Sequence, residues 1–354
     1  MTAVHQVVAS FAPRDATGNH TLQVQSVLHE LGYESEIFVA VARPEVRRLT
    51  RAFQDHPGGG WLLYQLSTGS SVADWLSARP EPKIVNYHNI TPASFFAPWE
   101  PHVGVELDAG RRQLRELAPL SSLAIADSGY NQEELTEVGY DPTTVVPILL
   151  DTATFEHGVD EAHLERLRAQ SAGGAAWLFV GRLAPNKCQH DLMKAFAVYR
   201  QVFDPDARLR LVGGSSSGAY HDALLELASA IGIERSVDFV GDVPDAVHGA
   251  HFRAADVYVS LSEHEGFGVP LLEAMHHRLP IVAYGAAAVP ETIGAGGLCL
   301  EAKDPATVAT AVHRVLVDHA LRDGLVAAGT ARLGDFDLAT SRRRFADAVR
   351  SVVG

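Results

Sequence analysis

Short apolar runs rich in β-branched residues alternate with amphipathic segments along nearly the whole chain. Continuous apolar runs of this length are typical of buried parallel strands, and their alternation with helical patterns is typical of βαβ units. The pattern therefore predicts an α/β fold with doubly wound parallel sheets. Strands are expected at residues 5–10, 35–40, 61–66, 83–89, 122–128 and 144–149 in the first half, and at residues 175–182, 207–214, 236–241, 255–261, 279–285 and 296–300 in the second.

The two sets of predicted strands are separated by residues 151–176, where a charged helical pattern leads into small residues. After residue 334 only a helical pattern follows. We therefore expect a Rossmann-like domain over residues 1–170, a second over residues 171–333, and a C-terminal helix over residues 334–354 that crosses back onto the first domain. Two such domains would form a cleft between the carboxyl ends of their strands, where ligands of open α/β sheets bind.

Composition excludes several classes of function. The chain has 354 residues, of which 47% are apolar and 20% charged, as in ordinary globular proteins. The net charge of −14 repels nucleic acid. Cys188 and Cys299 are the only cysteines, so no disulfide framework is expected and a reducing compartment fits. The N-terminal sequence lacks a basic, apolar leader, and no run approaches 18 apolar residues, so we expect a cytoplasmic protein.

One basic stretch qualifies the expectation of a cytoplasmic protein. Arg43, Arg47, Arg48 and Arg51 fall within one predicted helical segment, which could contact an anionic membrane that presents a lipid acceptor. The segment has few large apolar residues, and such a helix anchors poorly. A solvated face is therefore the favoured interpretation.

The segment SEHEGFGVPLLEAM, residues 262–275, directly follows a predicted strand. Pro270 suits the first position of a helix, and the free N–H groups at a helix N-terminus attract anions. Glu265 and Glu273 can accept hydrogen bonds from hydroxyl groups, while Gly266 and Gly268 permit close approach to the backbone. The combination indicates a polyhydroxylated anion such as a nucleotide sugar. The alternative is that Glu273 stabilises the helix and Glu265 is merely solvated.

A second segment, FVGRLAPNK, brings two cations to the same predicted sheet edge. Arg182 directly follows a strand, and Lys187 precedes the next helix after a Pro185–Asn186 turn. A guanidinium group offers a fork of donors for phosphate oxygens, and an ammonium group offers a compact charge. Two loop cations are often only solvated, but next to the glutamate segment they indicate a diphosphate site.

These two segments, together with LPIVAYGAAAVPE at residues 279–291, resemble the retaining glycosyltransferases of family four. Glu265 and Glu273 match the two glutamates that this family separates by seven residues. The resemblance implies the GT-B fold, in which two Rossmann-like domains face each other across a cleft. It also implies transfer of a sugar from a nucleotide-diphosphate sugar to an acceptor hydroxyl, with the donor bound by the second domain and the acceptor by the first. The acceptor class would be a sugar, a lipid-linked sugar or a natural product.

The resemblance also implies roles for individual residues. Arg182 and Lys187 would bind the donor diphosphate and stabilise the leaving group, Glu265 would contact the donor sugar, and His88 would face the sugar or acceptor. Gly18 and Asn19 would belong to a flexible glycine loop near the diphosphate and acceptor. The remaining donor-binding residues would be Gly181, Gly214, Val240, Val243, Gly266, Phe267, Gly268, Val269, Leu271 and Glu273, of which Val240 and Val243 would meet the base and Glu273 the ribose.

The chain departs from the family pattern at three points. The first loop has one glycine, Gly18, where many relatives have two. Cys188 and Arg278 stand where family members usually carry glycine. At the end of a helix, Arg278 is expected to need a left-handed backbone, at a cost of about 1 kcal/mol for a residue with a Cβ atom. The departure concerns loop geometry and leaves the charged residues in place.

Other readings of the sequence stay open. Residues 214–218, GSSSG, match the nucleophile elbow of α/β-hydrolases, so Ser216 could be a hydrolytic nucleophile. A nucleotide-sugar hydrolase or epimerase on the same fold, or a non-catalytic subunit that binds sugar nucleotides, are further alternatives. The two Asp-x-Asp triplets at residues 204–206 and 335–337 lie in predicted turns, where aspartate is common. We expect neither a metal nor a cofactor, because Arg182 and Lys187 can neutralise the diphosphate.

Overall fold

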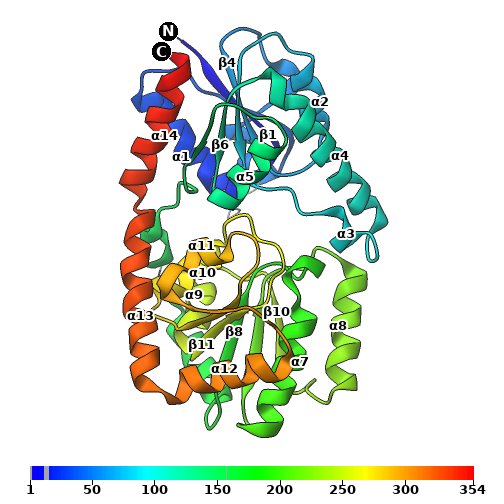
Figure 1. Ribbon diagram of the computed structural model, residues 1–354, viewed down its shortest axis with the longest axis vertical. Coiled ribbons are helices and arrows are strands. Elements are labelled where there is room, and N and C mark those ends of the chain that lie inside the picture. Colours follow the sequence, from blue (N-terminus) through cyan, green and yellow to red (C-terminus); the bar gives the residue numbers. More distant parts are fainter. Residues whose placement is uncertain (1, 12–15, 157) are drawn as a thin grey trace. The chain divides into compact units, whose positions relative to one another are not determined.

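The computed structural model describes residues 2–11, 16–156 and 158–354. The chain divides into two compact units (Figure 1). The first comprises Met1–Leu150 and Phe336–Gly354, and the second comprises Asp151–Asp335. Each unit has its own parallel sheet and its own buried core.

The first unit is built on a seven-stranded sheet in the order β3-β2-β1-β4-β5-β6-β7, with every neighbouring pair parallel. Its strands are β1 (Val4–Phe11), β2 (Ile37–Ala42), β3 (Arg51–Ala52), β4 (Trp61–Leu66), β5 (Lys83–Tyr87), β6 (Ser121–Ala126) and β7 (Thr143–Val145). Its α-helices are α1 (Ala16–Glu30), α2 (Ser71–Ser77), α3 (Ala93–Phe96), α4 (Pro101–Leu117), α5 (Gly129–Glu137) and α14 (Leu338–Val353). The order turns back on itself at β1 and β4, as in doubly wound sheets.

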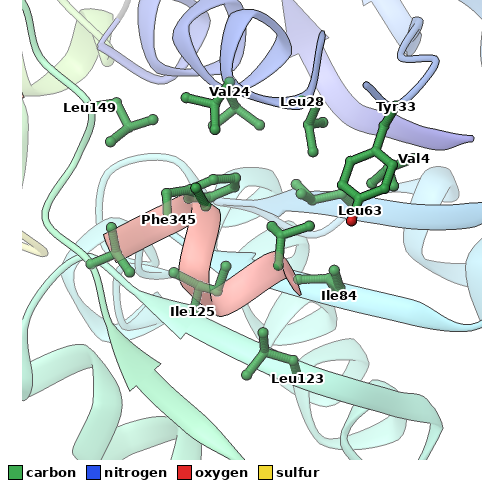
Figure 2. Close-up of a cluster of buried hydrophobic side chains, with 14 residues drawn as sticks. Val4, Val24, Leu28, Tyr33, Leu63, Ile84, Leu123, Ile125, Leu149 and Phe345 are labelled. Carbon is green, nitrogen blue, oxygen red and sulfur yellow. The ribbon is translucent and has the colours of Figure 1, made fainter. Parts of the chain in front are cut away.

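The C-terminal helix α14 completes the core of the first unit. Phe345 is fully buried among side chains of the central strands and of α1, as Figure 2 shows. Arg342 binds Glu30 of α1 at 2.6 Å, and Tyr33 donates a hydrogen bond to the carbonyl of Gly354 at 3.3 Å. The last helix therefore packs on the first unit although α13, which precedes it, belongs to the second.

The second unit is built on a six-stranded parallel sheet in the order β10-β9-β8-β11-β12-β13. Its strands are β8 (Ala176–Val180), β9 (Arg208–Val212), β10 (Val237–Gly241), β11 (Val257–Ser260), β12 (Ile281–Tyr284) and β13 (Leu298–Leu300). Its α-helices are α6 (Glu161–Gln170), α7 (Gln189–Val202), α8 (Gly218–Ala230), α9 (Asp245–Ala254), α10 (Val269–His276), α11 (Val289–Ile293), α12 (Pro305–Val317) and α13 (His319–Leu333). Trp177 of β8 is fully buried, and its ring lies 5.4 Å from that of Phe196 on α7.

The border between the units lies earlier in the chain than residue 170, where the sequence predicts it. Helix α6 belongs to the second unit because its apolar face packs against α9, where Leu164 and Leu167 are buried with Ala250. Only two leucines of this segment are buried, and charged residues are frequent in its sequence. For this reason the sequence pattern resembles that of a linker. The second unit consequently starts at Asp151.

The basic stretch is not one helix, so this expectation is wrong. A short 3₁₀-helix spans Pro44–Leu49, and Arg51 lies on the edge strand β3. Arg51 binds Glu36 at 3.0 Å and lies over the ring of Phe38. Arg47 and Arg48 therefore lie on the 3₁₀-helix, Arg43 precedes it, and Arg51 lies on β3. Of these cations, Arg51 is already paired.

Cys188 and Arg278 both adopt the left-handed backbone conformation, with φ of 51° and 57°. Arg278 follows the end of α10, where its N–H binds the carbonyl of Met275 at 3.0 Å and the N–H of Leu279 binds that of Ala274 at 2.9 Å. Glycine usually occupies such a position because it lacks a Cβ atom. The strain expected at Arg278 is thus present in the structure.

Replacing Arg278 with glycine is expected to raise the free energy of unfolding of the second unit by about 1 kcal/mol. The Arg278 side chain is exposed, so little packing is lost. Arg278→Ala, which keeps a Cβ atom, serves as the control and should show no such gain. Urea unfolding of both variants measures the difference; equal stability of the glycine and alanine variants would contradict a strained backbone at this position.

Candidate functional site

The predicted donor residues lie in loops at one edge of the second sheet. Strands β8 and β11 are parallel neighbours, so the β8 loop (residues 181–188) and the β11 loop (residues 261–268) leave the sheet side by side. Asn186 links the two loops twice. Its carbonyl accepts the N–H of Glu263 at 2.9 Å, and its side-chain amide donates to the carbonyl of His264 at 3.1 Å.

Lys187 and Glu265 form the centre of this site. The Lys187 Nζ atom lies 2.6 Å from Glu265 Oε2, and the two side chains are 18% and 16% exposed. An ion pair that is partly shielded from water is stronger than a surface pair, and both groups keep a solvent-facing side for a ligand. The structure thus brings together two residues that the sequence places 78 positions apart.

Arg182 lies in the same loop with an exposed side chain. Its carbonyl accepts a hydrogen bond from Gln189 Nε2 at 3.0 Å, which fixes the backbone. Within the described parts of the chain, its guanidinium group has no ion-pair partner. The cation is therefore available to an anionic ligand at this edge.

Helix α10 begins at Val269, so Pro270 is its second residue, one later than expected. Gly268 precedes the helix with a φ of 94°, and a Cβ atom there would lie 2.8 Å from the Leu271 side chain. Phe267 and Leu271 are buried. Their side chains belong to the core, so only their backbone could contact a donor, and the N–H of Leu271 already binds the carbonyl of Gly268 at 2.9 Å.

Glu273 on α10 pairs with His248 on α9. Oε1 of Glu273 lies 3.0 Å from Nε2 of His248, and the carboxylate side chain is 14% exposed. Burial lowers the pKa of His248, but the hydrogen bond and charge of Glu273 outweigh burial and raise this pKa above its ordinary value. The predicted ribose contact is therefore held in place by a neighbouring helix.

The β9 loop packs against the β8 loop. The N–H of Leu183 binds the carbonyl of Gly214 at 2.9 Å, and Gly214 donates its own N–H to Asp242 at 2.8 Å. A Cβ atom at Gly214 would lie 2.5 Å from the Asp242 carboxylate, so a larger residue would require this side chain to move. Gly181, with a φ of 148°, begins the β8 loop. Val240 is the last residue but one of the edge strand β10, and Val243 lies in the loop after this strand, so both are at its carboxyl end.

Ser216 does not have the surroundings of a hydrolytic nucleophile. Its hydroxyl donates to the carbonyl of Leu183 at 3.1 Å, and its N–H binds the same carbonyl at 3.0 Å. A nucleophilic serine needs a base in hydrogen-bond contact. The hydroxyl of Ser216 instead connects the β9 loop to the β8 loop.

His88 follows β5 in the first unit, where both of its ring nitrogens are engaged. Nδ1 lies 2.7 Å from Asp127 Oδ2, Nε2 lies 2.7 Å from Gln65 Oε1, and the side chain is 4% exposed. A ligand could reach a ring nitrogen only by displacing one of these partners. The sugar- or acceptor-facing role of His88 stays a prediction.

Gly18 and Asn19 lie in the first turn of α1, so the glycine loop expected there is, over its described residues, helical. Thr21 donates its hydroxyl to the carbonyl of Thr17 at 2.7 Å, a bond made within one helical turn. Asp15, the first residue of the matching segment, lies outside the described residues. A single glycine in a helix costs only about 1 kcal/mol relative to alanine, so Gly18 does not prevent the helix from forming.

Several residues of the site have no sequence signal of their own. His248 is one of 17 histidines, and Asp242 follows a strand as many loop residues do. Asn186 falls inside the FVGRLAPNK segment, but its role as a link between two loops depends on the strand order. Only the parallel pairing of β8 with β9 and β11 reveals which loops are neighbours.

Residues 169–332 match the family model of glycosyl transferases group 1. Among curated relatives, a D-inositol 3-phosphate glycosyltransferase of Geodermatophilus obscurus is 35% identical over 55% of this chain and 44% of the relative. The O-antigen chain mannosyltransferase B of Escherichia coli is 26% identical over 74% of this chain and 68% of the relative. The chain spans about half the length of the inositol-phosphate glycosyltransferases that it matches first.

Solved structures of similar fold cover almost the whole chain. Anabaena HepE in complex with UDP and glucose aligns with a TM-score of 0.76 and 19% identity, over 99% of this chain and 100% of that one. Sucrose-phosphate synthase from Thermosynechococcus elongatus aligns with a TM-score of 0.77 and 17% identity, over 99% of both chains. These similarities define the GT-B fold.

The family match lies in the unit that carries Arg182, Lys187, Glu265 and Glu273. The predicted GT-B fold and the predicted resemblance to glycosyltransferases are thereby confirmed. In the described part of the chain, every helix is too short or too polar to cross a membrane.

Proposed function

We propose that this chain is a retaining glycosyltransferase of family four, which transfers a sugar from a nucleotide-diphosphate sugar to an acceptor hydroxyl. The observation that carries the proposal is the Lys187–Glu265 pair at 2.6 Å, at the sheet edge where α10 begins. Both side chains lie within the region that matches the glycosyl transferases group 1 family.

The donor is proposed to bind in the second unit. The diphosphate binds Arg182 and Lys187, the sugar contacts Glu265 and the backbone of Gly266–Gly268, and the ribose contacts Glu273. The availability of the Arg182 guanidinium and the restraint of Glu273 by His248 support these roles. The base lies near Val240 and Val243, at the end of β10.

The chemistry follows from charge separation. As the bond between the anomeric carbon and the diphosphate oxygen breaks, negative charge grows on the diphosphate, and cations already held in place lower the barrier. The acceptor oxygen forms the new bond on the same face, and its proton passes to the departing phosphate. No side chain forms a covalent intermediate, and we propose that the two cations act without a metal.

The acceptor is proposed to bind in the first unit, beside His88. The named relatives suggest which acceptors to test, since one is a D-inositol 3-phosphate glycosyltransferase and another a mannosyltransferase. A neighbour of similar fold was solved with UDP and glucose. A polyol, a sugar or a sugar phosphate is therefore the acceptor class to test first. We propose that the reaction takes place in the cytoplasm.

An assay with labelled nucleotide sugars tests the proposal. UDP-, GDP-, ADP- and dTDP-sugars are each incubated with the enzyme, with and without a panel of polyols, sugars and sugar phosphates. We expect nucleotide release that depends on an acceptor, with the label in a new glycoside of retained configuration by NMR. Release without an acceptor would indicate a nucleotide-sugar hydrolase instead, and binding without turnover would indicate a binding subunit.

A further inference from the structure

Lys303 links three elements of the second unit. It lies between the edge strand β13 and helix α12. Its Nζ atom is 2.7 Å from Asp191 Oδ2 and 2.5 Å from Glu263 Oε1, and its side chain is 18% exposed. The same ammonium group lies 5.5 Å from the ring centroid of Tyr284 at the end of β12.

The two carboxylates bound by Lys303 flank the candidate donor site. Asp191 lies in the first turn of α7, four residues after Lys187, and Glu263 lies two residues before Glu265. Lys303 therefore joins the helix that follows one loop to the middle of the other loop. Together with the hydrogen bonds of Asn186, it fixes the separation of the loops that carry Lys187 and Glu265.

The charges require a cation between these carboxylates. Two carboxylates that share one partner repel each other unless a positive group lies between them. Burial lowers the pKa of Lys303, but the hydrogen bonds that its ammonium group donates to Asp191 and Glu263 outweigh burial and raise this pKa above its ordinary value. Burial raises the pKa of Asp191, but Lys303 and its neighbours lower it overall. The ammonium group of Lys303 therefore lies between the two carboxylates as a cation.

A metal ion is the competing explanation for this cluster. Cys188, His190 and Asp191 have ligand atoms that all lie within 4.8 Å of one another. Asp191, however, already binds Lys303 and also Lys194, the latter at 3.2 Å. The lysine ammonium group thus supplies the positive charge in this cluster.

We propose that Lys303 is a positioning residue that sets the geometry of the Lys187–Glu265 pair by tying Asp191 to Glu263. The inference rests on the proposed donor site, because it assigns to Lys303 an effect on that site. Lys303 itself is not proposed to touch the donor.

The test compares Lys303→Met, which keeps the length of the side chain and loses its charge, with Lys303→Arg and Lys194→Met. Lys194 also pairs with Asp191 but is 45% exposed and, among the residues that the structure describes, forms no ion pair with the β11 loop, so it is a matched control. The Kd of UDP, GDP, ADP and dTDP is measured by titration calorimetry, and kcat and KM are measured with the donor that the wild type uses. We expect Lys303→Met to lower kcat by roughly 10-fold and to weaken nucleotide binding, because small misplacements of a catalytic group reduce turnover strongly.

Lys303→Arg should recover most of the loss, and Lys194→Met should stay within about twofold of the wild type. Glu263→Gln in the Lys303→Met background should add little further loss, because both changes break the same link. If Lys303→Met lowers only the melting temperature while kcat, KM and Kd match the wild type, the inference is wrong. If Lys303→Met does not fold, Glu263→Gln alone replaces it, with the same expected loss. Added Zn²⁺ that restores Lys303→Met would instead favour the metal explanation and overturn the inference.

The outcome for the wild type separates this inference from the proposed function. A wild type that transfers sugar while Lys303→Met behaves identically sinks the inference alone. A wild type that neither binds any of the four nucleotides nor turns over a donor sinks the proposed function, and the role of Lys303 falls with it.

Discussion

Replacing Lys187 with alanine is expected to lower kcat for sugar transfer by at least ~100-fold, equivalent to about 2.7 kcal/mol of transition-state stabilisation. The ammonium group lies 2.6 Å from Glu265 in a partly buried site, where charge on a leaving diphosphate is poorly screened. Because the interaction strengthens as the bond breaks, the loss should appear in kcat more than in KM. Steady-state kinetics with the preferred donor measure both parameters.

Removal of Lys187 also leaves Glu265 unpaired, so a loss of activity could reflect a loss of structure. Arg182→Ala resolves this ambiguity, since the Arg182 side chain is exposed and, among the described residues, has no ion-pair partner that would be left behind. Arg182→Ala should lose ~100-fold in kcat with an unchanged melting temperature. Lys194→Ala, on the neighbouring helix, should retain activity. Full activity of either Arg182→Ala or Lys187→Ala would remove that residue from the mechanism.

Replacing Phe345 with alanine is expected to lower the stability of the first unit by about 3–5 kcal/mol. Phe345 is fully buried, and Figure 2 shows it among Val24, Leu63 and Ile125, which come from α1, β4 and β6. A cavity of this size costs both the transfer energy of the ring and the lost packing. Hydrogen exchange of the strand amides measures the effect separately for each unit.

The loss of protection should be confined to the first unit. Amides of β1 and β4 should exchange much faster in Phe345→Ala, whereas those of β8 and β11 should keep their protection. Arg344→Ala, one residue earlier and exposed, is the control and should change stability by less than about 0.5 kcal/mol. A loss below 1 kcal/mol, or one that falls on β8 and β11, would contradict the assignment of α14 to the first unit.

The strands of both sheets could be predicted from the sequence because strands of parallel sheets are buried on both faces and form continuous apolar runs. Each of the twelve predicted runs overlaps a strand. Among the described residues, β3 is the strand that the prediction lacks. It has only two residues, Arg51 and Ala52, both exposed, and pairs with β2 at the sheet edge. Because neither residue is buried, the sequence has no apolar run at this strand.

The location of Lys187 and Glu265 at one edge of the sheet could also be anticipated, because both follow strands and the carboxyl ends of parallel strands share that edge. Their direct contact could not be anticipated, and neither could the partners of Glu273 and Glu263. His248 reaches Glu273 because α9 packs beside α10, and Lys303 reaches Glu263 because the chain returns to the sheet edge after β13. Those contacts depend on the strand order, which local patterns leave undetermined. At the first turn of α1 the local pattern itself gave the wrong structure, since the described residues around Gly18 resemble a loop in sequence but form a helix.

A crystal structure of the chain with a bound nucleoside diphosphate shows directly whether this edge of the second sheet is the donor site. We expect diphosphate oxygens within hydrogen-bond distance of both the Arg182 guanidinium group and the Lys187 ammonium group, with the ribose hydroxyls on Glu273. A nucleotide bound elsewhere, or one whose diphosphate touches neither cation, would contradict this expectation.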